Sequence, residues 1–176
     1  MHLRQAIYEH LLKSERLAEE AISYYSGGEL RRVLVGFDYD GQDKLLIKTP
    51  RINLYIDPAD GGTLFEFDIK EPGLERNIQD TMTRYREPYL EGCGVNPDCY
   101  RRVSWRLHVW SVDTTIRDWL FNTPFKDVSD LALLRHHVAL AEDPRLVYLR
   151  GVGGFYSHGA RVASILVEKA VRGEST

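Results

Sequence analysis

The amino-acid sequence predicts a single α+β domain: an N-terminal helix, an antiparallel β-meander, and then a strand–helix–helix–strand–helix series that completes a mixed sheet. Three observations lead to this prediction. Apolar residues recur at helical spacing near the N-terminus, apolar and polar residues alternate between residues 31 and 70, and helical and extended patterns alternate after residue 100. A length of 176 residues suits one domain, so residues 1–176 are expected to fold as one globular unit.

The first expected element is a helix over residues 2–25. Its apolar side chains are three, four or seven positions apart and therefore share one stripe: Leu3, Ile7, Leu11, Ala18, Ile22 and Tyr25. Gly27 and Gly28 are expected to end the helix, because glycine adopts the left-handed C-terminal cap at no steric cost. A helix with such a stripe is expected to cover a sheet.

Residues 31–70 are expected to form three or four antiparallel strands. Two apolar runs, RRVLVGF and KLLIK, flank the turn DYDGQD, which is typical of a hairpin. In the next two segments every second residue is apolar: Ile52, Leu54 and Ile56, then Phe65, Phe67 and Ile69. A strand with one solvated face shows this alternation.

Residues 71–87 are predicted to form a helix with Pro72 in its first turn, where a missing backbone N–H costs nothing. A loop rich in glycine and proline separates this helix from residues 101–112, which are predicted as a strand because their side chains alternate in character. One face of that strand is apolar, and the other carries Arg102, Ser104, Arg106, His108 and Trp110.

The chain is then expected to form a short helix after Asp113, a second helix over residues 129–142, a strand at 145–149 and a terminal helix. The apolar stripe of the terminal helix would be Val162, Ile165, Leu166 and Ala170. If strands 101–112 and 145–149 are parallel, their C-terminal ends lie on one sheet edge.

Composition argues against several classes of protein. A formal net charge of −3 disfavours nucleic-acid binding. No apolar run approaches the roughly eighteen residues that span a bilayer, and the N-terminus lacks the apolar core of a secretory signal, so a cytoplasmic protein without membrane contact is expected. Cys93 and Cys99 lack a complete zinc ligand set, so they are expected to be free thiols or a disulfide. No metal or cofactor is predicted.

The segment LRGVGGFYSHGAR, residues 149–161, resembles two phosphate-binding patterns and satisfies neither. Gly151 and Gly153 match a dinucleotide fingerprint, but Tyr156 stands where its third glycine belongs. Against a P-loop, Ala160 and Arg161 replace the lysine and the hydroxyl residue. Two interpretations stay open: a tight turn that needs glycine, or a helix N-terminus that attracts an anion between flanking arginines.

The second interpretation joins this segment to the polar face of strand 101–112. His108 and His158 become candidate catalytic acids or bases, since histidine titrates near neutral pH. The candidate ligand-binding residues are Arg102, Arg106, Trp110, Arg150, Gly153, Gly154, Tyr156, Ser157 and Arg161. A solvated strand face that forms ion pairs with Glu66 and Asp68 explains the same pattern without a ligand.

The sequence therefore predicts a small cytoplasmic protein that binds an anionic small molecule bearing phosphate or carboxylate, with a histidine acid or base if it is an enzyme. The alternative is a protein-binding module, such as an inhibitor, immunity or adaptor protein. Its acidic segments FDYDGQD and DPADGGTLFEFD would complement a basic partner. RNA binding through the arginines near residue 101 ranks last because of the net charge.

Overall fold

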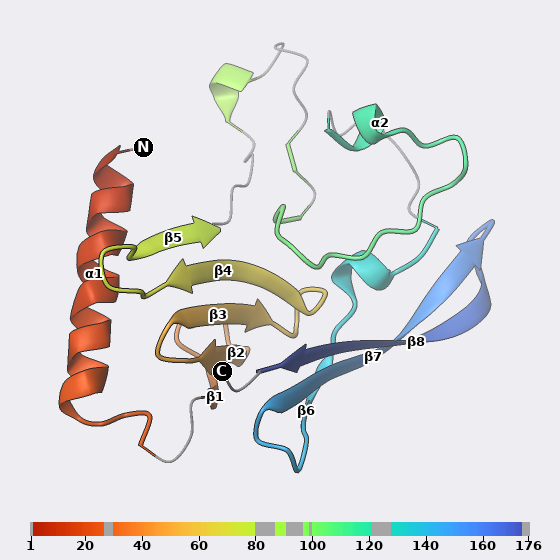
Figure 1. The fold of residues 1–176 in the computed structure, drawn as a ribbon. Helices are drawn as coiled ribbons and strands as arrows, with labels where there is room; N and C mark the ends of the chain where they lie inside the picture. Colours follow the sequence, from red (N-terminus) through yellow and green to blue (C-terminus); the bar gives the residue numbers. More distant parts are fainter. Residues whose placement is uncertain are drawn as a thin grey trace.

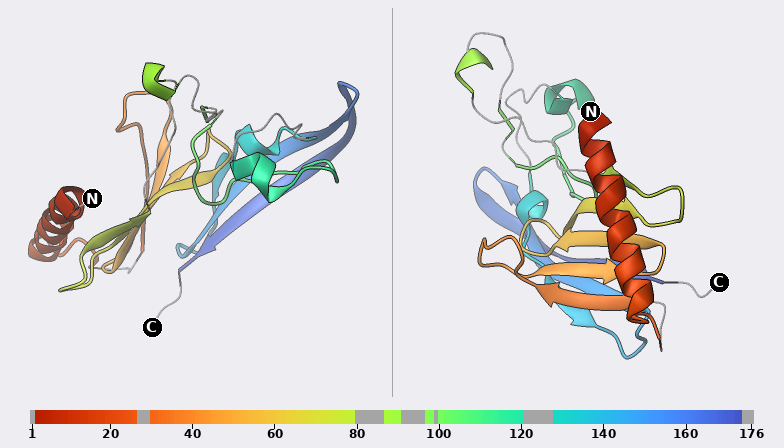
Figure 2. Two further views of the ribbon diagram at one scale, coloured as in Figure 1. Left: turned by 90° about the horizontal axis from the view of Figure 1, so that it is seen from above. Right: turned by 90° about the vertical axis from the view of Figure 1, so that its left-hand side faces the viewer.

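The computed structural model describes residues 2–26, 30–79, 87–90, 97–98, 100–120 and 128–173. A five-stranded antiparallel sheet packs against a three-stranded antiparallel sheet, and one long helix lies on the other side of the larger sheet (Figures 1 and 2). The predicted mixed α+β fold is therefore wrong. Most of the regular structure is β, and all pairs of described strands are antiparallel.

Helix α1, His2–Ala21, contacts the larger sheet through charged side chains. Glu19 binds Lys48 and Lys70 at 2.7 Å, and Glu15 binds Lys48 at 2.5 Å. The predicted apolar stripe faces away from the sheet: Leu3, Ile7, Leu11 and Ile22 are between 51% and 77% exposed. Leu12 is instead the buried leucine of this helix, at 3% exposure. The helix is present as expected, but it is rotated relative to the expected orientation.

The larger sheet is a meander in which the strands pair in chain order: β1 Arg31–Val35, β2 Lys44–Lys48, β3 Ile52–Asp57, β4 Thr63–Ile69 and β5 Arg76–Gln79. The strands expected between residues 31 and 70 are thus found. The helix predicted over 71–87 is wrong, because a turn containing Pro72 and Gly73 leads into β5. Residues 80–86 of that predicted helix lie outside the described residues.

The smaller sheet contains β6 His137–Leu140, β7 Leu146–Ser157 and β8 Ala160–Arg172, again in chain order. The helix predicted over 129–142 is wrong: a 3-10 helix, η2 (Leu131–Leu133), precedes β6. The predicted terminal helix is also wrong, since residues 160–172 form β8. Val167 is buried while its neighbours Leu166 and Glu168 are exposed, which is the alternation of a strand.

Residues 101–112 form an irregular segment, in which Trp105 has a positive φ of 67°, and this segment pairs locally with the larger sheet. The backbone N–H of Leu64 donates a hydrogen bond to the Ser104 carbonyl at 3.1 Å. The regular strand predicted here and its parallel pairing with residues 145–149 are therefore wrong. The short helix expected after Asp113 is α2, Ile116–Leu120, and a 3-10 helix, η1, covers Pro88–Leu90. Cys93 and Cys99 lie outside the described residues.

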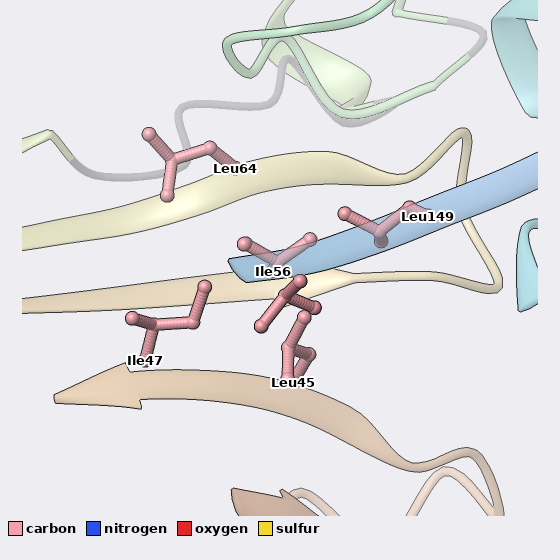
Figure 3. Packing of buried hydrophobic residues seen from close by; sticks show 6 residues of the cluster. Leu45, Ile47, Ile56, Leu64 and Leu149 are labelled. Atoms are coloured by element: carbon pink, nitrogen blue, oxygen red, sulfur yellow. The ribbon is translucent and has the colours of Figure 1, made fainter. Parts of the chain in front are cut away.

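The hydrophobic core lies between the two sheets. Alternate side chains of the larger sheet face β7 and interdigitate with its inward side chains, as in other β-sandwiches. The buried cluster consists of Leu45, Ile47, Ile56 and Leu64 from the larger sheet and Val147 and Leu149 from β7 (Figure 3). Within the described ranges, we find no helix with the length and hydropathy needed to cross a bilayer.

Candidate functional site

The glycine-rich segment is part of a long hairpin between β7 and β8 (blue in Figure 1). Ser157 ends β7, and His158 and Gly159 form the turn, with positive φ angles of 49° and 81°. The Ser157 hydroxyl lies 3.1 Å from Nδ1 of His158, and both residues are exposed. No helix begins at this turn, so the anion site expected at a helix N-terminus has no structural basis.

Gly153 and Gly154 allow a neighbouring segment to approach β7 closely. A Cβ atom on Gly153 would contact Leu131 Cδ2 and would lie 2.8 Å from Asp130 Oδ1. The Asp130 carboxylate accepts hydrogen bonds from the Gly154 N–H at 2.7 Å and from the Tyr156 hydroxyl at 3.1 Å. Arg161 lies across Gly154 and donates to the Gly153 carbonyl at 2.7 Å. These contacts account for the glycines without a ligand.

Three of the predicted ligand-binding arginines form ion pairs within the protein. Arg102 binds Asp98 at 2.7 Å and also donates to the Trp119 carbonyl at 2.8 Å. Arg106 binds both carboxylate oxygens of Asp60, at 2.9 and 2.7 Å. Arg150 pairs with Glu168 across the β7–β8 hairpin at 2.5 Å. The sequence interpretation in which carboxylates compensate the arginines therefore describes these three residues, with partners other than those expected.

The two predicted halves of the site are connected through Val128. Its N–H donates to the Val109 carbonyl at 2.9 Å, and its carbonyl accepts from the Tyr156 N–H at 2.8 Å. Residues around 109 and 156 thus lie on either side of one extended segment. His108 packs between the rings of Tyr100 and Trp110, with centroids 5.1 and 5.7 Å away. The catalytic roles of His108 and His158 stay predictions.

A buried charge network ties the segment after residue 100 to the larger sheet. Asp57 forms ion pairs with Lys44 at 3.2 Å and with Arg101 at 2.7 Å. Burial alone would raise the pKa of Asp60, but hydrogen bonds and charge from Arg106 and Arg101 outweigh it, so the pKa is lowered. The Asp60 carboxylate therefore stays ionised at neutral pH, and the ion pairs of Asp57 and Asp60 tie this segment to the larger sheet. The described residues contain no group of three His, Cys, Asp or Glu side chains placed to hold a metal ion.

The side chain of Lys169, in β8, connects the two sheets. Its ammonium donates to the carbonyls of Gly61 at 2.6 Å and Gly62 at 3.0 Å, both in the turn between β3 and β4, and to that of Trp105 at 2.6 Å. Burial, aided by the charge of Arg106, lowers the pKa of Lys169 to about 8. The side chain therefore acts as a structural cross-link.

Phe37, Tyr55 and Phe65 contact one another on the face of the larger sheet that points away from the smaller sheet, and Tyr39 lies in the same β1–β2 loop as Phe37. We call Phe37, Tyr39, Tyr55 and Phe65 the Tyr39 patch. Tyr55 sits in β3 between Leu54 and Ile56, which face the core, so its own side chain faces the other way. The Phe37 ring lies 6.0 Å from Tyr55 and 6.4 Å from Phe65, between ring centroids.

The loop that carries Tyr39 is held by Lys44. This buried lysine contacts Asp40 at 2.5 Å and Asp38 at 3.4 Å, so the residues on both sides of Tyr39 are anchored. Tyr39 itself is 96% exposed and has a positive φ of 58°, which is uncommon for a residue with a side chain. These residues were not among the candidate site residues selected from the sequence. The available signal was an aromatic at every second position, Phe37 and Tyr39, next to a turn.

Comparisons with known proteins find similarity to parts of alpha-amylases and 4-alpha-glucanotransferases. Residues 36–96 match the family described as Alpha-amylase/4-alpha-glucanotransferase, C-terminal. Alpha-amylase 1 of Dictyoglomus thermophilum is 39% identical over 88 residues, which are 50% of this chain and 12% of that protein. An alpha-amylase of Pyrococcus furiosus is 29% identical over 144 residues, 69% of this chain and 20% of that protein. A 4-alpha-glucanotransferase of Thermococcus kodakarensis is 31% identical over 90 residues, 51% of this chain and 12% of that protein.

The fold is similar to part of the crystal structure of 4-alpha-glucanotransferase from Thermococcus litoralis. The TM-score is 0.78 at 20% identity, and the superposition covers 97% of this chain and 25% of that chain. The chain thus spans only a small part of the length of the proteins it matches. These similarities, to the C-terminal part of carbohydrate-active enzymes, overturn both predicted functions, the binder of an anionic small molecule and the protein-binding module.

Proposed function

We propose that this chain serves as the C-terminal β domain of an enzyme that acts on α-glucan chains, while the catalytic groups of that enzyme lie in another part of it. The observation that carries this proposal is the superposition over 97% of the chain on one quarter of a 4-alpha-glucanotransferase. The family match over residues 36–96 supports the same assignment from sequence. A cytoplasmic location and a single folded unit over residues 1–176 remain part of the proposal.

Three carboxylates that are fixed within the fold, Asp57, Asp60 and Asp68, do not fit a catalytic role. Glycoside hydrolysis generally needs a pair of carboxyl groups, one of them protonated, on either side of the sugar bond. Asp57 forms an ion pair with Arg101, and Asp60 forms one with Arg106. The pKa of Asp60 is lowered, whereas a general acid needs a raised pKa. Burial raises the pKa of Asp68, the right direction, but this side chain is 1% exposed and accepts a hydrogen bond from Asn77. A glucan cannot reach it.

A domain transplant tests the proposal. The region of the Thermococcus litoralis enzyme that superimposes on this chain is replaced by residues 2–173, and the transfer of glucan units is measured. We expect activity within about tenfold of the parent, a difference of about 1.4 kcal/mol in activation free energy. The control is the same enzyme carrying an unrelated β-sandwich of similar length, which is expected to be inactive.

Two results would contradict the proposal. One is a transplant that is folded, judged by circular dichroism and a single chromatographic peak, yet has no more activity than the control. The other is release of reducing sugar from amylose by the isolated chain, because the catalytic groups would then be in this chain.

A further inference from the structure

Tyr39 is presented to solvent by a loop that is otherwise firmly held. Lys44 is completely buried, and its ammonium anchors Asp38 and Asp40 on either side of the tyrosine. Asp40 also accepts a hydrogen bond from the Gln42 N–H at 2.8 Å, which closes the turn after it. Holding a non-glycine residue at a positive φ costs free energy, and such residues persist where the surroundings fix them. The loop therefore holds the residues on both sides of Tyr39 in place and leaves its ring uncovered.

The rest of the Tyr39 patch forms an aromatic floor beside this loop. Phe37 is 42% exposed and rests on Tyr55 and Phe65, whose own rings lie 6.1 Å apart. The Arg101 guanidinium lies 5.2 Å from the centre of the Phe65 ring and limits the floor on that side. Since Phe37 and Tyr39 precede β2 by only a few residues, the floor and the loop share one rigid support, the larger sheet.

The chemistry of this surface suits a sugar. One face of a glucose ring presents C–H groups, which pack against the electron-rich face of an aromatic ring, and its rim presents hydroxyl groups that donate to carboxylates. Asp38 and Asp40 are partly exposed beside Tyr39, and Lys44 compensates their charge. The surface thus offers aromatic faces and acceptors without demanding a charged ligand.

The same surface lies within the region that resembles glucan-acting enzymes. All four residues of the Tyr39 patch, and Lys44 and its three aspartates, fall inside residues 36–96, the segment matched by the alpha-amylase and 4-alpha-glucanotransferase family. We infer that the Tyr39 patch binds a chain of α-1,4-linked glucose units. This inference rests on the proposed function for the identity of the sugar, whereas the site itself follows from the exposed rings of Phe37 and Tyr39 and from the Tyr55 and Phe65 rings that support Phe37.

The binding of maltoheptaose tests the inference. The probe is titrated into isotopically labelled protein, and the affinity and the perturbed residues are read from amide resonances. Chemical-shift changes are expected to concentrate on residues 36–46, 55 and 65. Replacing one aromatic contact, Tyr39→Ala, is expected to weaken binding about three- to tenfold, whereas Tyr39→Phe retains most of it. Cellohexaose, with β-1,4 linkages, is expected to bind more weakly than maltoheptaose.

Tyr89→Ala is the matched control. Tyr89 is another exposed tyrosine inside the matched region, but it is not part of the patch. Its replacement is expected to leave the affinity unchanged, and thermal melts of all variants verify that the fold is intact. The inference is overturned if wild type shows no shift changes at millimolar maltoheptaose, or if Tyr39→Ala binds as tightly as wild type.

The outcomes separate this inference from the proposed function. An active transplant that does not bind maltoheptaose through Tyr39 would support the proposed domain function and contradict the inference that the Tyr39 patch binds glucan. An inactive transplant, together with maltoheptaose binding that Tyr39→Ala weakens, would support the patch and contradict the domain assignment.

Discussion

Gly153 lies where the side chains of Leu131 and Asp130 leave no room for a Cβ atom on β7. Gly153→Ala would place a methyl group against Leu131 and Asp130, so overpacking is expected to lower the free energy of unfolding by about 1–3 kcal/mol. Gly36→Ala is the matched control, because its new Cβ would lie 3.5 Å from Asp43 in ordinary contact; its effect is expected to stay within about 0.5 kcal/mol. Urea unfolding followed by circular dichroism measures both. Equal effects would refute the close-packing explanation.

Local patterns could not have predicted the role of this glycine. The sequence indicated that residues 149–161 needed glycine, and it offered a tight turn or an anion-binding helix start. The requirement comes instead from Asp130 and Leu131, which reach β7 only after the chain has folded. The same holds for Arg106, whose partner Asp60 lies 46 residues earlier. The sequence thus indicated which residue types matter in this segment, but it could not indicate the distant residues that they contact.

Helix α1 contacts the sheet through a side that lies about 100° around the helix from its most regular apolar stripe. Leu12 is buried and Leu11 is 60% exposed, so two adjacent leucines provide a matched pair. Leu12→Ala is expected to lower the free energy of unfolding by about 2–4 kcal/mol, because it removes buried apolar atoms and leaves a cavity. Leu11→Ala is expected to change it by less than about 0.5 kcal/mol. Thermal and urea unfolding distinguish this orientation from the predicted one, in which Leu11 would be the costly position.

Strand β8 shows why a helix was predicted where a strand forms. Its inward positions include Ile165, Val167, Lys169 and Val171, and the lysine interrupts an otherwise apolar alternation. When Lys169 is counted as a polar position, the remaining apolar residues of this segment fit helical spacing as well as strand alternation. β3 has no such interruption on its core face, and the meander between residues 31 and 70 was predictable for that reason. A functional or cross-linking polar residue thus obscures the pattern of its own strand.

At the scale of the whole molecule, the two sheets are joined by the apolar core and by the polar cross-link from Lys169. This side chain extends from β8 to the β3–β4 turn and to the segment after residue 100, so it connects three parts of the chain that are distant in sequence. The Tyr39 patch depends on the same assembly, since Arg101 beside Phe65 belongs to that segment. Neither arrangement could be predicted, because both depend on how the sheets pack.

The lowered pKa of Lys169 predicts how stability changes with pH. Between about pH 8 and its ordinary value of 10.5, this amine is mostly neutral in the folded protein and mostly protonated in the unfolded chain. The unfolded state then binds more protons, so the contribution of Lys169 to the free energy of unfolding rises as pH rises through this window. Relative to Lys169→Met, wild type is therefore expected to gain about 1–3 kcal/mol between pH 7 and pH 10. Urea unfolding of both proteins at the two pH values measures this difference, and subtraction removes the titration of tyrosines common to both. A difference that stays constant, or that shrinks as pH rises, would mean that the three carbonyl contacts favour the ammonium more than burial opposes it.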